Sequence, residues 1–221
     1  MGEERTAIRL VLLGPPGAGK GTQSDRIAEH YHIPHISTGD LFRTHLRAGS
    51  SLGKTAQGYM NEGRLVPDGV TEAMVWERLA ESDAQAGYVL DGFPRNLAQA
   101  EHFDQDPSRR LDRVIHLVAD EALLLDRLTG RWTCPKCQAS YHLRFHAPRQ
   151  AGICDACGTR LTERADDRAE AVERRLRVYF AETEPLVGYY RERGLLVAVD
   201  GSRSVEEVTE AVLKALEVAD D

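Results

Sequence analysis

The stretch that decides the fold is Ile8–Leu13, IRLVLL, which runs directly into Gly14–Thr22, GPPGAGKGT. A short apolar run that ends in glycine is typical of a buried strand. The glycines allow several backbone N–H groups to converge on an anion without clashes from Cβ atoms. The helix predicted over residues 19–30 adds the partial positive charge of its N-terminus, and Lys20 adds a full one. Strand, loop and helix together predict a phosphate-binding loop.

This loop departs from the general pattern at one position. The pattern places Ser or Thr directly after the lysine, whereas Gly21 follows Lys20 here and Thr22 supplies the hydroxyl. An ordinary glycine-rich turn is the alternative, but it does not require Gly14, Gly19 and Lys20 between a strand and a helix. We therefore expect ATP phosphates to be bound by Gly17, Ala18, Gly19, Lys20, Gly21 and Thr22.

Outward from the loop, short apolar runs alternate with longer segments of helical period. Strands are predicted at 8–13, 33–36, 88–90, 114–118 and 195–199. Helices are predicted at 41–46, 52–61, 70–80, 96–103, 121–129, 169–191 and 205–218, with caps at Ser37 or Thr38, Asp68 and Ser204 and a kink at Pro185. This alternation predicts an α/β fold with a five-stranded parallel sheet covered by helices on both faces. Residues 130–167 break the alternation and form an insertion.

Composition limits the class of protein. The chain has 221 residues, of which 42% are hydrophobic, and a net charge of −7. One domain with an inserted module fits this length, and the acidic charge argues against a general nucleic-acid binder. No apolar run approaches the ~18 residues of a membrane span. The first ten residues, MGEERTAIRL, carry acids and no apolar run, so a secretory signal is not expected and we expect a cytoplasmic protein.

All four cysteines fall within 24 residues of the insertion, in the pattern C-x2-C-x16-C-x2-C. They are Cys134, Cys137, Cys154 and Cys157. Two paired knuckles of this kind predict a structural metal site, because four thiolates close a tetrahedron and leave no position for a catalytic water. Zn²⁺ suits all-sulfur ligation best, with Fe²⁺ or Co²⁺ as alternatives. Four free thiols are the first alternative, and a zinc ribbon that binds nucleic acid is the second, which the acidic charge disfavours.

Two further segments accompany the phosphate loop and the cysteines: Ile36–Arg43, ISTGDLFR, and Asp91–Gln99, DGFPRNLAQ. With them, from about Ile8 to Val218, the chain resembles adenylate kinases of the long bacterial form with a metal-bearing lid. The resemblance implies a phosphate-loop kinase whose core comprises 1–36, 67–129 and 168–221. It also implies a small helical AMP-binding segment at 37–66 and a zinc-ribbon-like lid at 130–167.

The resemblance implies an acceptor site for AMP. Arg43 and Arg95 hold the phosphate by bidentate bonds, and Thr38 and Gln99 contact the adenine. The other residues implied at AMP are Arg64, Leu65, Val66, Gly92, Phe93, Pro94, Arg164 and Arg175. Asp91 holds Mg²⁺ through water. Taken singly, STGD is a helix cap and Gln99 a surface amide, so only their joint occurrence favours the site.

Phosphoryl transfer requires in-line positioning of two phosphates, positive charge on the transferring group and exclusion of water. Arginines stand at both ends of the insertion, and the resemblance implies catalytic roles for Lys20, Arg95, Arg127, Arg131, Arg164 and Arg175. It implies ATP contacts for Arg127, Arg131, Ser140, Tyr141 and Arg203. Asp166 and Asp167 orient the arginines or, alternatively, stabilise the helix dipole. No histidine is assigned a catalytic role.

The implied activity is the reversible reaction of Mg²⁺-ATP with AMP to give two ADP. The implied cofactors are Mg²⁺ and structural Zn²⁺, and the expected state is a monomer without nucleic-acid or membrane partners. Within the class, a kinase for UMP/CMP or GMP, or a GTP-dependent variant, is the alternative; Gln99 and the long lid favour AMP. From another class, a non-catalytic nucleotide-binding zinc-ribbon scaffold is the alternative, but a scaffold does not need this set of cations.

Overall fold

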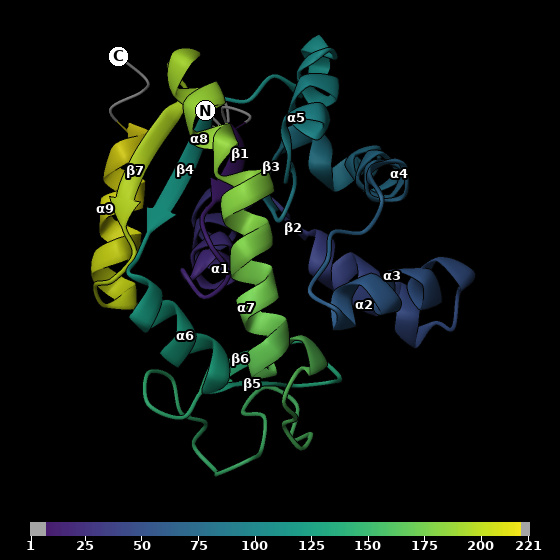
Figure 1. Cartoon of the computed structure of the whole chain (residues 1–221). Coiled ribbons are helices and arrows are strands. Elements are labelled where there is room, and N and C mark those ends of the chain that lie inside the picture. The colour runs from purple at the N-terminus through teal and green to yellow at the C-terminus, as the bar shows by residue number, and fades with distance from the viewer. Residues whose placement is uncertain (1–7, 218–221) are drawn as a thin grey trace.

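The computed structural model describes residues 8–217. Its centre is a sheet of five parallel strands in the order β2-β3-β1-β4-β7 (Figure 1). The strands are β1 (Ile8–Leu13), β2 (His35–Ser37), β3 (Gly87–Asp91), β4 (Arg113–Val118) and β7 (Leu196–Asp200). The predicted α/β fold with a five-stranded parallel sheet is confirmed.

Both faces of the sheet are covered because the central strand is apolar on both. Along β1, Leu10 and Leu12 enter one core cluster, whereas Val11 and Leu13 enter the other. The first cluster is completed by α1 (Lys20–Tyr31), α6 (Glu121–Thr129), α7 (Ala169–Val178) and α9 (Val205–Glu217). The second is completed by α4 (Asp68–Leu79), α5 (Leu97–Asp104) and α8 (Pro185–Glu192). Val218, the predicted end of the last helix, lies outside the described residues.

Two of the three predicted caps are confirmed. The Ser37 hydroxyl accepts from the backbone N–H of Asp40, and Ser204 and Glu207 form a reciprocal capping box. The prediction for Asp68 is wrong, since Pro67 holds the N-cap position and Asp68 is the first helical residue. The Asp68 carboxylate accepts instead from the side chains of Asn96 and Gln99.

The helix predicted over 169–191 is divided before Pro185. After α7 the chain forms a π-helical turn, η4 (Tyr179–Thr183), and α8 then begins at Pro185. Proline has no N–H to donate, and the N–H of Glu184 bonds back to Tyr179 O at 2.9 Å. Within the turn, the Thr183 hydroxyl donates to the backbone carbonyl of Arg95 at 2.7 Å, so the irregular segment supports a predicted site residue.

Two small units extend from the sheet. One comprises α2 (Thr38–Arg47) and α3 (Ser51–Asn61), at the right of Figure 1, with its own apolar cluster around Phe42 and Ala56. The other lies at the bottom of that view and contains the antiparallel pair β5 (Arg131–Thr133) and β6 (Ser140–His142). Single turns η1 (Ser82–Ala86), η2 (Pro107–Arg109) and η3 (Ala165–Asp167) complete the described elements.

The two small units touch each other. Arg47, at the end of α2, donates to the backbone carbonyls of Pro135 and Lys136, each at 3.0 Å. Arg43 Nε donates to Gln138 Oε1, also at 3.0 Å. Because these bonds bridge the mouth between the units, the space beneath them is partly closed. Within residues 8–217, no helix combines the length and apolar character needed to cross a bilayer.

Two neighbouring tyrosines on α8 test the packing of the second cluster. Tyr190 is fully buried and its hydroxyl has no hydrogen-bond partner within residues 8–217, whereas the Tyr189 hydroxyl donates to Asp104 at 2.9 Å. An unpaired buried hydroxyl destabilises a fold, so Tyr190→Phe should leave the free energy of unfolding unchanged or raise it, while Tyr189→Phe should lower it by about 1 kcal/mol. Urea unfolding of both variants measures the difference. Equal losses would show that the Tyr190 hydroxyl has a partner.

Candidate functional site

A cleft of about 1160 Å³ opens at the carboxyl ends of the parallel strands. In the strand order, the connection after β1 leads to β2 on one side, whereas the connection after β3 leads to β4 on the other side. Open α/β sheets bind ligands at such a reversal of direction. Single small-molecule pockets usually measure about 300–1,000 Å³, so this cleft has room for a pair of ligands. Every predicted nucleotide-site residue lines it except Phe93. The Phe93 side chain is buried in the second cluster, edge-on to Trp76 and Phe103.

The loop after β1 holds its shape through glycines that approach other backbone closely. Gly14 has φ +145°, and a Cβ there would lie 2.6 Å from Leu117 O; Gly17 has φ +87°, and its Cβ would lie 2.9 Å from Leu124 O. A side chain at either position would push the loop away from β4 or α6. Lys20 reaches back across the loop and donates to Gly14 O at 2.7 Å and to Pro15 O at 3.1 Å. Its ammonium group is thereby held over the anion-binding concavity.

Lys20 and Asp91 form the charged floor of the cleft. Burial lowers the pKa of Lys20 to about 8, although the negative charge of Asp91 opposes this shift. Burial would raise the pKa of Asp91, but the nearby His35 imidazole, with Nε2 3.8 Å from Asp91 Oδ2, and the charge of Lys20 outweigh it and lower the pKa to about 2. Asp91 is therefore ionised at neutral pH. An anion placed beside Lys20 would favour its charged form.

Sequence reasoning missed His35. Its Nδ1 lies 2.7 Å from Asp25 Oδ1, and its Nε2 lies 3.8 Å from Asp91 Oδ2. Burial alone would lower the pKa of His35, yet the two carboxylates raise it to about 10. The available signal was topological, because Ser37 pairs with Asp91 in the register of β2 and β3, which brings the ends of both strands together.

Asp167 organises the arginines that border the lid. It is almost completely buried, and it accepts from Arg131 and, at 2.9 Å, from Arg175. Asp166 Oδ2 lies 3.1 Å from Arg175 Nη1. The expectation that these two acids orient the arginines is confirmed for Arg131 and Arg175.

Other cations of the cleft have no acid of their own. Within residues 8–217, no carboxylate forms an ion pair with Lys20, Arg95, Arg127 or Arg164. Arg95, Arg127 and Arg164 donate instead to neutral oxygens, at Gly92 O, Gly201 O and Thr133 Oγ1. Burial, followed by the charges of Arg131 and Arg43, lowers the pKa of Arg164, although a guanidinium stays protonated. A set of partly buried cations without ion pairs is suited to a polyanion.

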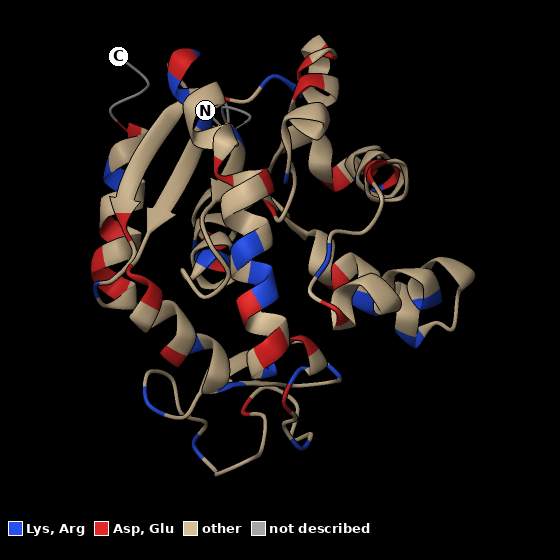
Figure 2. Cartoon of the chain, in the orientation of Figure 1, with Lys and Arg blue, Asp and Glu red and all other residues tan. Residues whose placement is uncertain are grey.

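The charge of the chain as a whole makes this local excess notable. Figure 2 shows Lys and Arg positions on α1 and α7 and in the loops below them, while Asp and Glu gather on α9 and α5. Asp and Glu outnumber Lys and Arg by 35 to 28, yet the cleft itself is basic.

Two arginines predicted at the nucleotides are exposed at the margin of the cleft. Arg203 lies 3.3 Å from Asp200 Oδ2. Arg64 is exposed as well, paired with Glu62 and lying over the Tyr59 ring.

On the side of the cleft towards α5, the polar side chains of Thr38 and Gln99 are held by hydrogen bonds. The Thr38 hydroxyl donates to Gly92 O at 2.9 Å. The buried Gln99 amide donates from Nε2 to Asp68 and accepts at Oε1 from the N–H of Arg95. One hydrogen on Nε2 and one lone pair on Oε1 are left over. Gln99 therefore still has one donor and one acceptor for a ligand.

The two predicted lid residues differ in exposure. Ser140 is exposed at the edge of the cleft. Tyr141 is buried, with its hydroxyl 3.5 Å from Cys154 Sγ and accepting from the N–H of Asp155 at 2.8 Å. The Tyr141 hydroxyl therefore supports the cysteine cluster, and only part of the residue borders the cleft.

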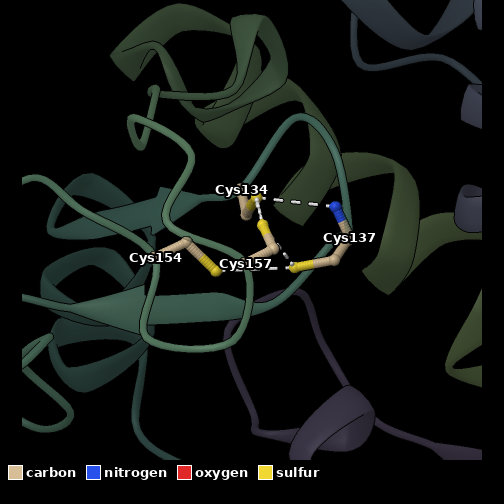
Figure 3. Close-up of side chains that lie close together, drawn as sticks. All are labelled: Cys134, Cys137, Cys154 and Cys157. Carbon is tan, nitrogen blue, oxygen red and sulfur yellow. Dashed lines mark hydrogen bonds between the residues drawn. The ribbon is translucent and has the colours of Figure 1, made fainter.

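The four cysteines converge as predicted (Figure 3). Their Sγ atoms all lie within 4.8 Å of one another, with separations of 3.4 Å for Cys134–Cys157 and 3.5 Å for Cys137–Cys154. Sulfurs about 2.3 Å from a tetrahedral Zn²⁺ lie about 3.8 Å apart, so the cluster needs little expansion to hold a metal. Hydrogen bonds with Thr159 lower the pKa of the Cys157 thiol to about 6. At Cys137 a backbone hydrogen bond is outweighed by burial and the other three cysteines, which raise the pKa of the thiol, so a metal would have to displace the Cys137 proton.

Comparison with known proteins finds one family over most of the chain. A family model described as "Adenylate kinase" matches residues 12–195. A protein named "Adenylate kinase" from Moorella thermoacetica is 51% identical over 212 residues, which cover 95% of this chain and 98% of that protein. One of the same name from Thermoanaerobacter pseudethanolicus is 50% identical, and one from Clostridioides difficile is 46% identical, with the same coverage.

The lowered pKa of Lys20 predicts a pH dependence of triphosphate binding. The charged ammonium is present below pH 8 and is lost as the pH rises through about 8. We therefore expect the affinity for ATP to be flat between pH 6.5 and 7.5 and to fall by up to about tenfold per unit well above pH 8. Titration calorimetry at each pH measures this profile. A decline that persists unchanged in Lys20→Met would assign it to another group.

Proposed function

The chain belongs to the adenylate kinase family, and from this premise we propose how its residues transfer the terminal phosphoryl group of ATP to AMP, giving two ADP. In this proposal the core of residues 1–36, 67–129 and 168–221 holds the donor. Residues 37–66 hold the acceptor, and residues 130–167 act as the lid over both. The observation that carries the proposal is a set of four partly buried cations that line the cleft and form no ion pair within residues 8–217: Lys20, Arg95, Arg127 and Arg164.

The donor phosphates are assigned to the loop after β1. Backbone N–H groups of residues 17–22 and the N-terminus of α1 supply partial positive charge. Lys20 is fixed by Gly14 and Pro15 and supplies a full charge. Arg127 and Arg131 approach from the lid side, and Arg131 is held in place by Asp167. Ser140, Tyr141 and Arg203 border the region assigned to the adenosine of ATP.

The acceptor is assigned to the opposite half of the cleft. Arg43, Arg95 and Arg164 line this half, and a monophosphate there would compensate the charges of Arg95 and Arg164, which form no ion pair in the described part of the chain; Arg43 already pairs with Asp40. Arg175 extends this set and is braced by Asp166 and Asp167. Thr38, Gln99 and the strip from Arg64 to Val66 line the region assigned to the base, with Gly92 and Pro94 next to it. Phe93 supports this wall from inside the core.

Catalysis then consists of positioning and charge stabilisation. Phosphoryl transfer needs no strong general base when the two phosphates are held in line and the transferring group is surrounded by cations. The contacts of Arg47 and Arg43 with residues 135–138 partly close the mouth of the cleft, and further closure over the substrates would keep water out. Exclusion of water matters because water would otherwise accept the phosphoryl group in place of AMP.

Asp91 fits the role of the Mg²⁺ residue. It is ionised and faces the cleft beside Lys20 and Gly21. Mg²⁺ keeps several of its waters in protein sites and binds through few carboxylates, which matches one acid acting through water. When bound, Mg²⁺ neutralises charge on the ATP phosphates. His35, which lies against Asp91, keeps that carboxylate ionised.

We assign Zn²⁺ to the four cysteines, in a structural role. All-thiolate ligation and sulfur separations close to those of a tetrahedron support this choice. All the residues assigned to the cleft come from one chain, which supports a monomer. The acidic net charge argues against nucleic acid as a partner, whereas the basic lining of the cleft supports nucleotides. We propose the cytoplasm as its location, in line with four free cysteines that converge on one site.

A phosphorus NMR time course tests the reaction. Purified protein is mixed with Mg²⁺-ATP and, in turn, AMP, UMP, CMP or GMP, and Mg²⁺-GTP is tried as the donor with AMP. We expect ADP to form with AMP and far more slowly with the others. Faster turnover with another monophosphate would overturn the assignment of the base site. Tight ATP binding without turnover would favour the nucleotide-binding scaffold.

Arg95 is the sharpest test of the acceptor site. Arg95→Ala should lower kcat by about 10²–10³-fold, the usual loss when one group that stabilises transition-state charge is removed. ATP binding should stay nearly intact, because Arg95 lies on the acceptor side. Single-turnover kinetics and calorimetry measure the two quantities separately. Arg193→Ala, at a position stacked on Tyr189 away from the cleft, is the control; equal loss of ATP binding and transfer would place Arg95 elsewhere.

Metal removal should separate stability from chemistry. A chelator should lower the unfolding temperature by at least about 5 °C, because a structural metal contributes directly to folding. Activity at low temperature should decline less. Calorimetry, metal analysis and assays on the same samples compare the two effects, and Cys134→Ser should respond to chelator no further. Immediate loss of activity in a still-folded protein would mean that the ion takes part in the reaction.

A further inference from the structure

The Gln99 amide is held by two partners of opposite kind. Its Nε2 donates to Asp68 Oδ1 at 2.6 Å, and its Oε1 accepts from the backbone N–H of Arg95 at 2.8 Å. A carboxylate only accepts and a backbone N–H only donates. Turning the amide over would bring oxygen against the carboxylate and nitrogen against the N–H. The orientation of Gln99 is therefore fixed by its surroundings.

Asp68 is itself held in place from α5. The Asn96 side chain donates to both of its oxygens, at 3.0 and 3.2 Å. Asn96 in turn is the N-cap of α5, with Oδ1 accepting from the N–H of Gln99 at 2.8 Å, which fixes which end of the Asn96 amide faces Asp68. A chain of directed bonds thus runs from the start of α5 through Asp68 to the cleft side chain of Gln99.

We propose that Asp68 is a specificity-determining positioning residue, which selects a 6-aminopurine monophosphate as acceptor by fixing the orientation of the Gln99 amide. This rests on the proposed function, in which Gln99 contacts the acceptor base. Gln99 is only 2% exposed, and its amide keeps one hydrogen on Nε2 and one lone pair on Oε1. Adenine offers a donor at its C6 amino group beside a ring-nitrogen acceptor, which matches that pair.

A 6-oxopurine reverses the pattern. Guanine and hypoxanthine carry a carbonyl acceptor at C6, and their N1 bears a hydrogen. To pair with that edge, the Gln99 amide would have to turn over, and Asp68 and the Arg95 N–H both oppose the turn. The discrimination therefore depends on Asp68, which need not touch the nucleotide. Inosine monophosphate is the best probe, because it differs from AMP only at this edge.

The test compares AMP with inosine monophosphate in wild type, Asp68→Asn and Asp68→Ala. We expect either substitution to lower the ratio of kcat/KM for AMP to kcat/KM for inosine monophosphate by about tenfold or more. This lies within the range that one bidentate base contact usually discriminates. The KM for ATP should not change. Equilibrium binding of both monophosphates provides a readout that does not depend on turnover.

Two control variants complete the design. Asp83→Asn removes one acid near the other end of α4, where it pairs with Arg78 on the surface, and should leave the ratio unchanged. Gln99→Ala should lower the ratio if Gln99 contacts the base. Thermal unfolding of each variant verifies that it is folded.

The outcomes separate the two ideas. A fall in the ratio in the Asp68 variants and in Gln99→Ala supports the proposal. A fall in Gln99→Ala alone, with AMP and inosine monophosphate weakened equally in the Asp68 variants, overturns the role of Asp68 and leaves the base site standing. An unchanged ratio in Gln99→Ala overturns the base site and, with it, the role of Asp68.

Discussion

Mutual repulsion among the guanidinium groups of the cleft is the constraint around which the molecule is organised. Asp167 offsets it at the centre by accepting from Arg131, at the start of β5, and from Arg175, on α7. Because this buried carboxylate stands at the end of the 130–167 insertion and binds Arg131 at its start, it fixes the two ends of the lid relative to each other and to α7. The charges it leaves uncompensated, on Arg95 and Arg164 among others, are available to the substrates.

The sheet and the cleft serve this arrangement in different ways. Apolar side chains on both faces of β1 bury the strand, so the loop at its end is anchored in a rigid core. Gly14 and Gly17 then permit the backbone to approach β4 and α6 closely. Lys20 and Asp91 are held over this loop with opposite charges. Within residues 8–217, the side-chain hydrogen bonds that link the two small units come from Arg43 and Arg47.

Features encoded by short spacings were predictable from the sequence. The phosphate loop, the paired cysteines and the five strands depend on neighbours in the chain, and the structure agrees with each. Features that depend on distant partners were not. Asp68 has the residue type and position of a helix cap, yet its partners lie 28 and 31 residues away on α5. His35 joins the site only through the pairing of β2 with β3, and the π-helical turn before Pro185 has no periodic signal of its own.

The bonds from Arg47 to the cysteine unit are made to main-chain oxygens of Pro135 and Lys136, and not to side chains. Such a contact depends on the path of the backbone between Cys134 and Cys137 and does not require particular side chains at positions 135 and 136. These two positions are therefore free to vary in an engineered library without loss of the bridge, provided that the knuckle keeps its shape. The bridge between the two small units thus depends on the geometry that the cysteines impose.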